Sequence, residues 1–298
     1  MRRLYLLLLL FAVKICFAQQ EYSVKSSDGT SIIVHEYGKG DPVVILAGGP
    51  GLNAAYMHDV WDSISHTHRC IVPDQRGTGK SFMQKVDSAG MSMDRYLEDL
   101  EALRNYLKLE KMVLIGHSWG GMLAMEYASR YPARVKKIIM LDPGGPTDKF
   151  VGYFNDNIMM RLHEEDLKEL HLLDSLHKPS LNVIVVGYFY DRKKGLAFGQ
   201  LTDSSVFGQA GVSRFTVQSY MAEQSLRIQA LQNYKGPVDI IQGRQDPIGE
   251  STPYEIKQYL PQSDIHFIER CGHFPWREND EQKHEFFALL NISLTEGH

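Results

Sequence analysis

The stretch Gly116-His117-Ser118-Trp119-Gly120-Gly121 decides the fold, because it joins two segments with different periodicity. The apolar residues 112–115 before it are typical of a buried strand, and the run from 122 to 131 after it is typical of a helix, closed by Pro132. A serine at such a sharp turn needs glycine two positions before it and two after it, since side chains there would clash. The pattern predicts a strand, a tight turn and a helix, with Ser118 exposed at the turn.

Strand-like and helix-like segments alternate on both sides of this turn. Residues 42–46, 70–72, 135–141, 238–242 and 264–268 are predicted strands, and residues 21–25 and 31–37 form a predicted hairpin. Predicted helices occupy residues 54–65, a run that begins after Ser92, and residues 254–260 and 278–290. This alternation predicts a mostly parallel α/β sheet covered by helices on both faces, with a core formed by residues 19–145 and 236–298.

The alternation stops between residues 146 and 235. Residues 154–162, 164–177 and 212–232 have helical periodicity, whereas residues 183–190 are compatible with either a helix or a strand. An insertion between two sheet strands, at the edge that carries Ser118, is expected to cover that edge. We therefore predict that residues 146–235 form a helical cap, whose aromatic side chains partly line a substrate pocket.

Composition excludes several classes of function. The 298 residues carry a formal charge of −4 and include no basic excess, so a nucleic acid is not an expected partner. Gly79-Lys80-Ser81 matches the end of a phosphate-binding loop, but Asp74 stands where that motif needs its first glycine. We therefore predict no nucleotide site.

The N-terminal residues have the pattern of an export signal. A basic start is followed by ten apolar residues, 4–13, and by small residues before a cleavage site ahead of Gln19. A membrane span would need about twenty apolar residues. We expect residues 1–18 to be a signal peptide, the mature protein to have no membrane span, and its location to be periplasmic or secreted. Lipidation at Cys16 is an alternative fate for this segment.

Removal of residues 1–18 leaves two cysteines, Cys70 and Cys271. Export implies an oxidising compartment in which disulfides form. Cys70 opens one predicted strand and Cys271 follows another, and we expect them not to be bonded to each other. The chain has no CxxC pair and no Cys/His spacing typical of a metal site, so we predict neither a metal nor a cofactor.

A serine hydroxyl is a weak nucleophile that needs a base and a group to orient that base. His273 follows the last predicted strand on a short glycine-bearing loop, which makes it the candidate base. Asp246 follows the first strand after the cap and is the candidate acid. Asp142, at the end of the preceding strand, is the alternative acid. In the predicted mechanism, His273 accepts the Ser118 proton, Asp246 orients the imidazole, and an acyl-enzyme forms.

Two backbone amides are candidates for the oxyanion hole. Trp119 follows the serine at the start of a helix, and Gly49 lies in the glycine cluster Gly48-Gly49-Pro50-Gly51 that follows a predicted strand. Amides at the end of a strand and at a helix N-terminus can stabilise the oxygen charge that develops during acyl transfer.

With these residues identified, the chain resembles the prolyl iminopeptidase branch of the α/β-hydrolase superfamily over nearly all of the predicted mature sequence. The matching motifs are Gly48-Gly49-Pro50-Gly51, Asp74-Gln75-Arg76-Gly77, Ser118-Trp119-Gly120, Asp246 and Gly272-His273. The resemblance implies an α/β-hydrolase fold with an eight-stranded sheet and an inserted cap. It also implies an aminopeptidase that releases N-terminal proline or small residues from short peptides.

Two positions depart from that family. Ala47 stands where the family has histidine, and Pro247 stands where some relatives have a carboxylate after the triad acid. An aminopeptidase must pair the substrate α-ammonium group, a role that Glu223, Glu164 or Glu165 of the cap could take. A carboxylesterase or another small-acyl hydrolase is the alternative enzyme, and a catalytically silent binding protein is the alternative of a different class. For either enzyme the expected partner is a small molecule or a short peptide.

Overall fold

A computed structural model describes residues 19–201 and 204–295. The predicted signal peptide, residues 1–18, lies outside the described residues. Within the described part of the chain, no helix has both the length and the apolar character that crossing a membrane requires.

One sheet of eight strands forms the centre of the molecule, in the order β1-β2-β4-β3-β5-β6-β7-β8. The β1–β2 and β2–β4 pairs are antiparallel and all the other pairs are parallel, which confirms the predicted mostly parallel sheet. The strands are β1 (Gln20–Lys25), β2 (Ser31–Tyr37), β3 (Asp41–Leu46), β4 (His68–Pro73), β5 (Met112–His117), β6 (Val135–Leu141), β7 (Val238–Gly243) and β8 (Ser263–Ile268).

Both faces of the sheet are buried under helices. In β3, Val43 and Ile45 point into one apolar cluster and Val44 and Leu46 into the other, as the twofold periodicity of a strand requires. The first cluster includes side chains of α1 (His58–Ile64) and α11 (Asp280–Thr295), and the second those of α2 (Met93–Tyr106), α3 (Trp119–Arg130) and α10 (Ser251–Tyr259). The continuous apolar runs in the sequence therefore correspond to strands buried on both sides.

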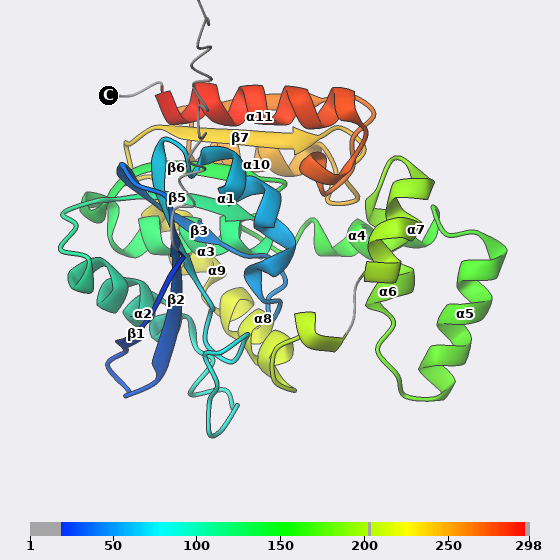
Figure 1. Cartoon of the computed structure of the whole chain (residues 1–298), viewed down its shortest axis with the longest axis horizontal. Coiled ribbons are helices and arrows are strands. Elements are labelled where there is room, and N and C mark those ends of the chain that lie inside the picture. The colour runs from blue at the N-terminus through cyan, green and yellow to red at the C-terminus, as the bar shows by residue number, and fades with distance from the viewer. Residues whose placement is uncertain (1–18, 202–203, 296–298) are drawn as a thin grey trace, which may run out of the picture.

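The chain between β6 and β7 holds six α-helices and two 3₁₀ helices in its described part. Helices α4 to α7 project to one side of the sheet (Figure 1), whereas α9 packs against α3. The α-helices are α4 (Val151–Met159), α5 (Glu164–Ser175), α6 (Leu181–Ile184), α7 (Arg192–Leu201), α8 (Val212–Ala222) and α9 (Gln224–Leu231).

The structure corrects one local expectation, the single helix at 212–232, and refines two others. The ambiguous segment 183–190 is mainly helical, as the end of α6 and the 3₁₀ helix η3 (Val185–Tyr188). The single helix expected at 212–232 is divided at Glu223 into α8 and α9. The helix expected at 54–65 begins as a 3₁₀ turn, η1 (Ala54–Met57), which the side chain of Asn53 caps by accepting a hydrogen bond from the Ala55 amide.

Candidate active site

Ser118 lies between the end of β5 and the start of α3, with the backbone angles φ 54° and ψ −116°. Such angles are costly for a residue with a side chain and are kept where the surrounding structure imposes them. A Cβ atom at Gly116 would lie 2.3 Å from the Gly120 carbonyl oxygen, and one at Gly120 would lie 2.1 Å from the Leu46 carbonyl oxygen. The two glycines are therefore required by close backbone contacts, and the turn presents Ser118 at the carboxyl edge of the sheet.

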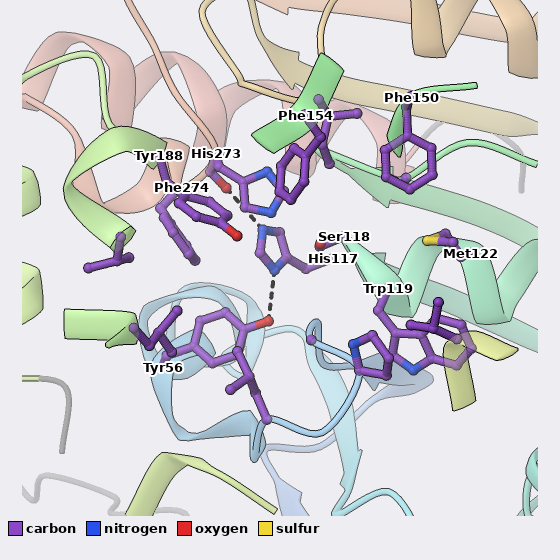
Figure 2. Close-up of a pocket in the computed structure, with 18 of the residues that line it drawn as sticks. Tyr56, His117, Ser118, Trp119, Met122, Phe150, Phe154, Tyr188, His273 and Phe274 are labelled. Carbon is purple, nitrogen blue, oxygen red and sulfur yellow. Dashed lines mark hydrogen bonds between the residues drawn. The ribbon is translucent and has the colours of Figure 1, made fainter. Parts of the chain in front are cut away.

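His273 and Asp246 meet at the same edge, on the loops that follow β8 and β7. The His273 Nδ1 atom lies 2.9 Å from Asp246 Oδ2, and the Ile248 amide donates to Asp246 Oδ1 at 2.8 Å. An imidazole that donates its Nδ1 proton to a carboxylate keeps Nε2 as an acceptor, which is the tautomer of a general base. Both side chains are buried, and Ser118 and His273 line the same cavity (Figure 2).

The backbone amides of the glycine cluster after β3 differ in their hydrogen bonding. The Gly48 amide donates to the Tyr56 hydroxyl at 2.6 Å. Within the described residues, the amides of Gly49 and Trp119 donate to no acceptor. Trp119 is the first residue of α3, where amides lack partners inside the helix and the helix dipole favours a negative charge. Gly49 and Trp119 can therefore serve as the two oxyanion donors.

The Asp74-Gln75-Arg76-Gly77 segment forms hydrogen bonds to the loop before Gly49 and to the side chain of Trp119. The Gln75 side chain donates to the Ala47 carbonyl at 2.8 Å and accepts from the Trp119 indole Nε1 at 2.8 Å. Arg76 is fully buried and donates to both Asp99 oxygens, at 2.7 and 2.6 Å. In the segment that resembles a phosphate-binding loop, the Lys80 amide donates to the Asp74 carboxylate at 2.8 Å. This amide therefore already has an acceptor within the protein.

Sequence reasoning missed one hydrogen-bonded chain in the site. The Tyr56 hydroxyl lies 2.7 Å from His117 Nδ1, and His117 Nε2 lies 2.9 Å from the His273 carbonyl oxygen (Figure 2). Burial, followed by the nearby His273, lowers the pKa of His117 well below its ordinary value, so this ring is neutral. The position of His117 beside the serine was the only signal in the sequence that could have indicated this role.

A cavity of about 260 Å³ opens in front of Ser118, between the core and the cap. Figure 2 shows aromatic side chains on several sides of it, with Met122 and Trp119 along α3. Its lining contains no aspartate, glutamate, lysine or arginine among the described residues. The cap side chains that line it are Phe150, Val151, Phe154, Leu181, Val185, Tyr188, Phe198, Val206, Val217, Tyr220 and Met221.

The family model described as "alpha/beta hydrolase fold" matches residues 41–175. A crystal structure of a proline iminopeptidase-related protein of Thermus thermophilus aligns with a TM-score of 0.72 at 19% identity, covering 94% of this chain and 100% of that chain. A 2-hydroxy-6-oxo-2,4-heptadienoate hydrolase of Pseudomonas putida is 27% identical over 286 residues, which are 89% of this chain and 93% of that protein. The protein has the α/β-hydrolase fold.

Other relatives match this chain over shorter segments. A cis-3-alkyl-4-alkyloxetan-2-one decarboxylase of Shewanella oneidensis is 38% identical over 122 residues, or 40% of this chain. A proline iminopeptidase of Heyndrickxia coagulans is 36% identical over 108 residues, or 36% of this chain. The matched segment spans 37% of the length of each of these two relatives.

The placement of Glu223 at the substrate site needs correction. Glu223 forms an ion pair with Arg130 of α3 and is absent from the cavity lining. The other two cap acids lie outside the lining as well: Glu164 pairs with Lys168 at 2.6 Å, and Glu165 with Arg192 at 3.0 Å. The physical reason is that a carboxylate in an apolar cavity would lose its hydration without gaining a partner.

Asp142, the alternative acid, lies at the end of β6 and is fully buried. Its Oδ1 accepts from the Gly243 amide at 2.8 Å, whereas the His273 Nδ1 atom is bonded to Asp246. Ligand atoms of Asp142, Asp246 and His273 all lie within 4.8 Å of one another. Because Nδ1 of His273 is engaged by Asp246, this cluster has the histidine–aspartate hydrogen bond expected of a general base and its orienting acid.

Proposed function

We propose that this α/β-hydrolase is a serine esterase that cleaves uncharged carboxylic esters through an acyl-enzyme on Ser118. The observation that carries the proposal is the cavity in front of Ser118, whose described lining has apolar and aromatic side chains but no carboxylate and no cation. Such a cavity stabilises apolar groups on either side of a reacting carbonyl.

The residues of the site support each step of this reaction. Ser118 Oγ attacks the ester carbonyl carbon while His273 Nε2 takes the hydroxyl proton, and Asp246 stabilises the imidazolium that forms. The amides of Gly49 and Trp119 donate to the tetrahedral oxyanion. His273 then returns its proton to the leaving alcohol, and a water molecule attacks the acyl-enzyme by the same route in reverse.

The cavity favours an ester over a peptide with a free N-terminus. An α-ammonium group that enters it would lose its hydration without a carboxylate to pair with, since Glu223, Glu164 and Glu165 pair with cations elsewhere. The effective penalty for an unpaired buried ion is several kcal/mol, and each 1.4 kcal/mol is about a factor of ten in affinity. Similarity to proline iminopeptidases is the observation that keeps aminopeptidase activity as the second candidate.

The same argument applies to anionic substrates. The Pseudomonas putida relative is named for a heptadienoate, which is a carboxylate. The described lining offers no lysine or arginine to pair with such a group. We therefore rank hydrolysis of anionic dienoates below hydrolysis of neutral esters.

A substrate panel tests the proposal. We expect p-nitrophenyl butyrate to be hydrolysed at least about a hundredfold faster, in kcat/KM, than the p-nitrophenyl monoester of succinic acid, because the free carboxylate has no partner in the cavity. Ser118→Ala should lose at least about a thousandfold in kcat. Ser175→Ala, on the exposed helix α5, should match the wild type.

The panel also includes alanine and proline p-nitroanilides, each with its N-acetylated counterpart. The ester proposal fails if either free-amine anilide is turned over faster than both its acetylated form and the butyrate ester. That result would instead establish the aminopeptidase. A fluorophosphonate that labels the wild type but not Ser118→Ala would identify the nucleophile in either case.

A further inference from the structure

Asp142 is a second acidic residue beside the triad, and the reaction proposed above does not use it. It directly follows β6 and has a left-handed backbone, φ 46°, which a non-glycine residue rarely adopts. Its side chain has no exposed surface. One of its oxygens, Oδ1, accepts from the Gly243 amide at 2.8 Å, so this carboxyl group is held in place by the neighbouring strand β7.

The other oxygen, Asp142 Oδ2, is buried and finds no donor among the described residues. A carboxylate oxygen in this state would be an uncompensated buried charge. Its neighbour is the Asp246 carboxyl group: an oxygen of Asp142 and an oxygen of Asp246 lie within 4.8 Å of each other, and both groups are buried. Two buried carboxyl groups at this distance strongly disfavour the state in which both are ionised, so the pair retains one proton.

The position of that proton follows from the partners of each carboxyl group. Asp246 already accepts two hydrogen bonds, from the Ile248 amide and from His273 Nδ1, and both favour its ionised form. Asp142 accepts only one from the backbone. The proton therefore lies on Asp142 Oδ2 and points to Asp246.

The other ionisable groups around this pair agree with that assignment. Glu278 accepts from the Gly272 amide at 3.0 Å and adds negative charge, and the Cys271 thiol beside it is neutral because burial raises its pKa. Arg161 is the nearby cation, and it donates to the Gly187 carbonyl at 3.2 Å. Burial, then the Asp246 charge, raises the pKa of Asp142 well above its ordinary value.

We propose that Asp142 is a positioning residue of the triad, a neutral carboxyl group whose Oδ2–H donates to Asp246, so that His273 faces one negative charge and not two. The donated hydrogen bond also withdraws charge from Asp246. It thereby limits how strongly the pair stabilises the imidazolium that forms when His273 accepts the Ser118 proton. The catalytic readout of this inference rests on the proposed function.

Two variants of Asp142 distinguish the loss of its hydrogen-bond donor from the loss of a charge. Asp142→Asn stays neutral and can still donate from Nδ2 to Asp246 while its oxygen accepts from Gly243. Asp142→Ala removes the donor. The readout is the second-order rate constant of Ser118 labelling by a fluorophosphonate, measured between about pH 5 and 9. The acidic limb of this pH profile is the range in which the rate falls because the base, His273, becomes protonated.

We expect the acidic limb of Asp142→Asn to coincide with that of the wild type. In Asp142→Ala, Asp246 carries a fuller charge toward His273, so the limb should move to higher pH by about one unit. Asp148→Asn, at an exposed carboxylate outside the site, is the control. If Asp142 were ionised, both variants would remove a charge and move the limb to lower pH, which would overturn the proposal. An unchanged limb in Asp142→Ala would overturn it as well, because a purely structural role alters stability alone.

Infrared spectroscopy tests the proton without any catalysis. The difference spectrum between wild type and Asp142→Asn at neutral pH should contain the C=O stretch of one protonated carboxyl group. The absence of that band overturns the inference, even if Asp142→Ala fails to fold. If the wild type is not labelled by the fluorophosphonate while the band is present, the proposed function fails and the protonated Asp142 stands.

Discussion

At the scale of single residues, Tyr56 connects the three segments that form the site. Its hydroxyl accepts from the Gly48 amide of the oxyanion loop at 2.6 Å and donates to His117 Nδ1 at 2.7 Å. Neutral His117 then donates from Nε2 to the carbonyl oxygen of His273 at 2.9 Å. One hydroxyl therefore helps to hold both the oxyanion donor loop and the backbone of the base.

The change Tyr56→Phe tests this connection. It keeps the ring but leaves the Gly48 amide and His117 Nδ1 without partners, which should lower the free energy of unfolding by about 1–3 kcal/mol. Small displacements of both loops should also slow Ser118 labelling about ten- to a hundredfold. Urea unfolding and labelling kinetics measure the two effects. Tyr106→Phe, at an exposed tyrosine, is the matched control, and wild-type values for Tyr56→Phe would contradict the argument.

At the scale of helices, a buried ion pair fixes α9 of the cap to α3 of the core. Arg227 and Glu126 are both fully buried, with Arg227 Nη1 2.6 Å from Glu126 Oε2. The guanidinium also donates to the Pro146 carbonyl at 3.0 Å and lies 3.4 Å from the ring centre of Tyr220, which lines the cavity. The Arg227 side chain therefore connects α9 with Tyr220 of α8 and with Glu126 of α3, the helix that follows Ser118.

Removing only the arginine of this ion pair should destabilise the folded protein. Arg227→Met leaves Glu126 without its hydrogen-bonded cation and with only the more distant Arg130, whose Nε lies 3.7 Å from Glu126 Oε1, and we expect a loss of about 3 kcal/mol in the free energy of unfolding. The double variant Glu126→Gln with Arg227→Met should recover much of that loss, since no buried charge remains. Urea unfolding of the wild type, both single variants and the double variant measures the coupling energy between the two side chains. Arg214→Met, at an exposed arginine, is the control. Additive losses in the double variant would show that the two charges do not depend on each other.

The division of the predicted helix 212–232 has a cause that periodicity cannot reveal. Glu223 takes φ −94° and ψ 5°, and the chain turns there so that α8 faces the cavity and α9 faces α3. Tertiary contacts impose this turn. Helix α7 was missed because Gly195 and Gly199 lower its helix propensity. Both glycines are needed for close packing: a Cβ at Gly199 would lie 2.2 Å from the Asn182 carbonyl oxygen.

At the scale of the whole molecule, the sheet and the positions of Ser118, Asp246 and His273 could be predicted because each follows a buried strand. Parallel strands bring their carboxyl ends to one edge, so chain order alone places these residues together. The polarity of the cavity could not be predicted, because it depends on which sides of α4, α6 and α8 face inward. Glu223 illustrates this limit, since its residue type suited a substrate amine while its position paired it with Arg130.

The thiols of Cys70 and Cys271 can report whether the core unfolds in one cooperative step. Cys70 in β4 and Cys271 beside His273 are free and fully buried, and burial raises the pKa of Cys70 to about 12 and also raises that of Cys271. Since the thiolate is the reactive form, a chain beginning at Gln19 should react with a thiol reagent only when the core opens. We expect no modification of the native protein within minutes. In urea, the modification of both cysteines should follow the loss of helical circular dichroism. Native-state reaction of Cys271 alone, at a rate insensitive to the stability of the protein, would show instead that the loop carrying His273 opens by itself.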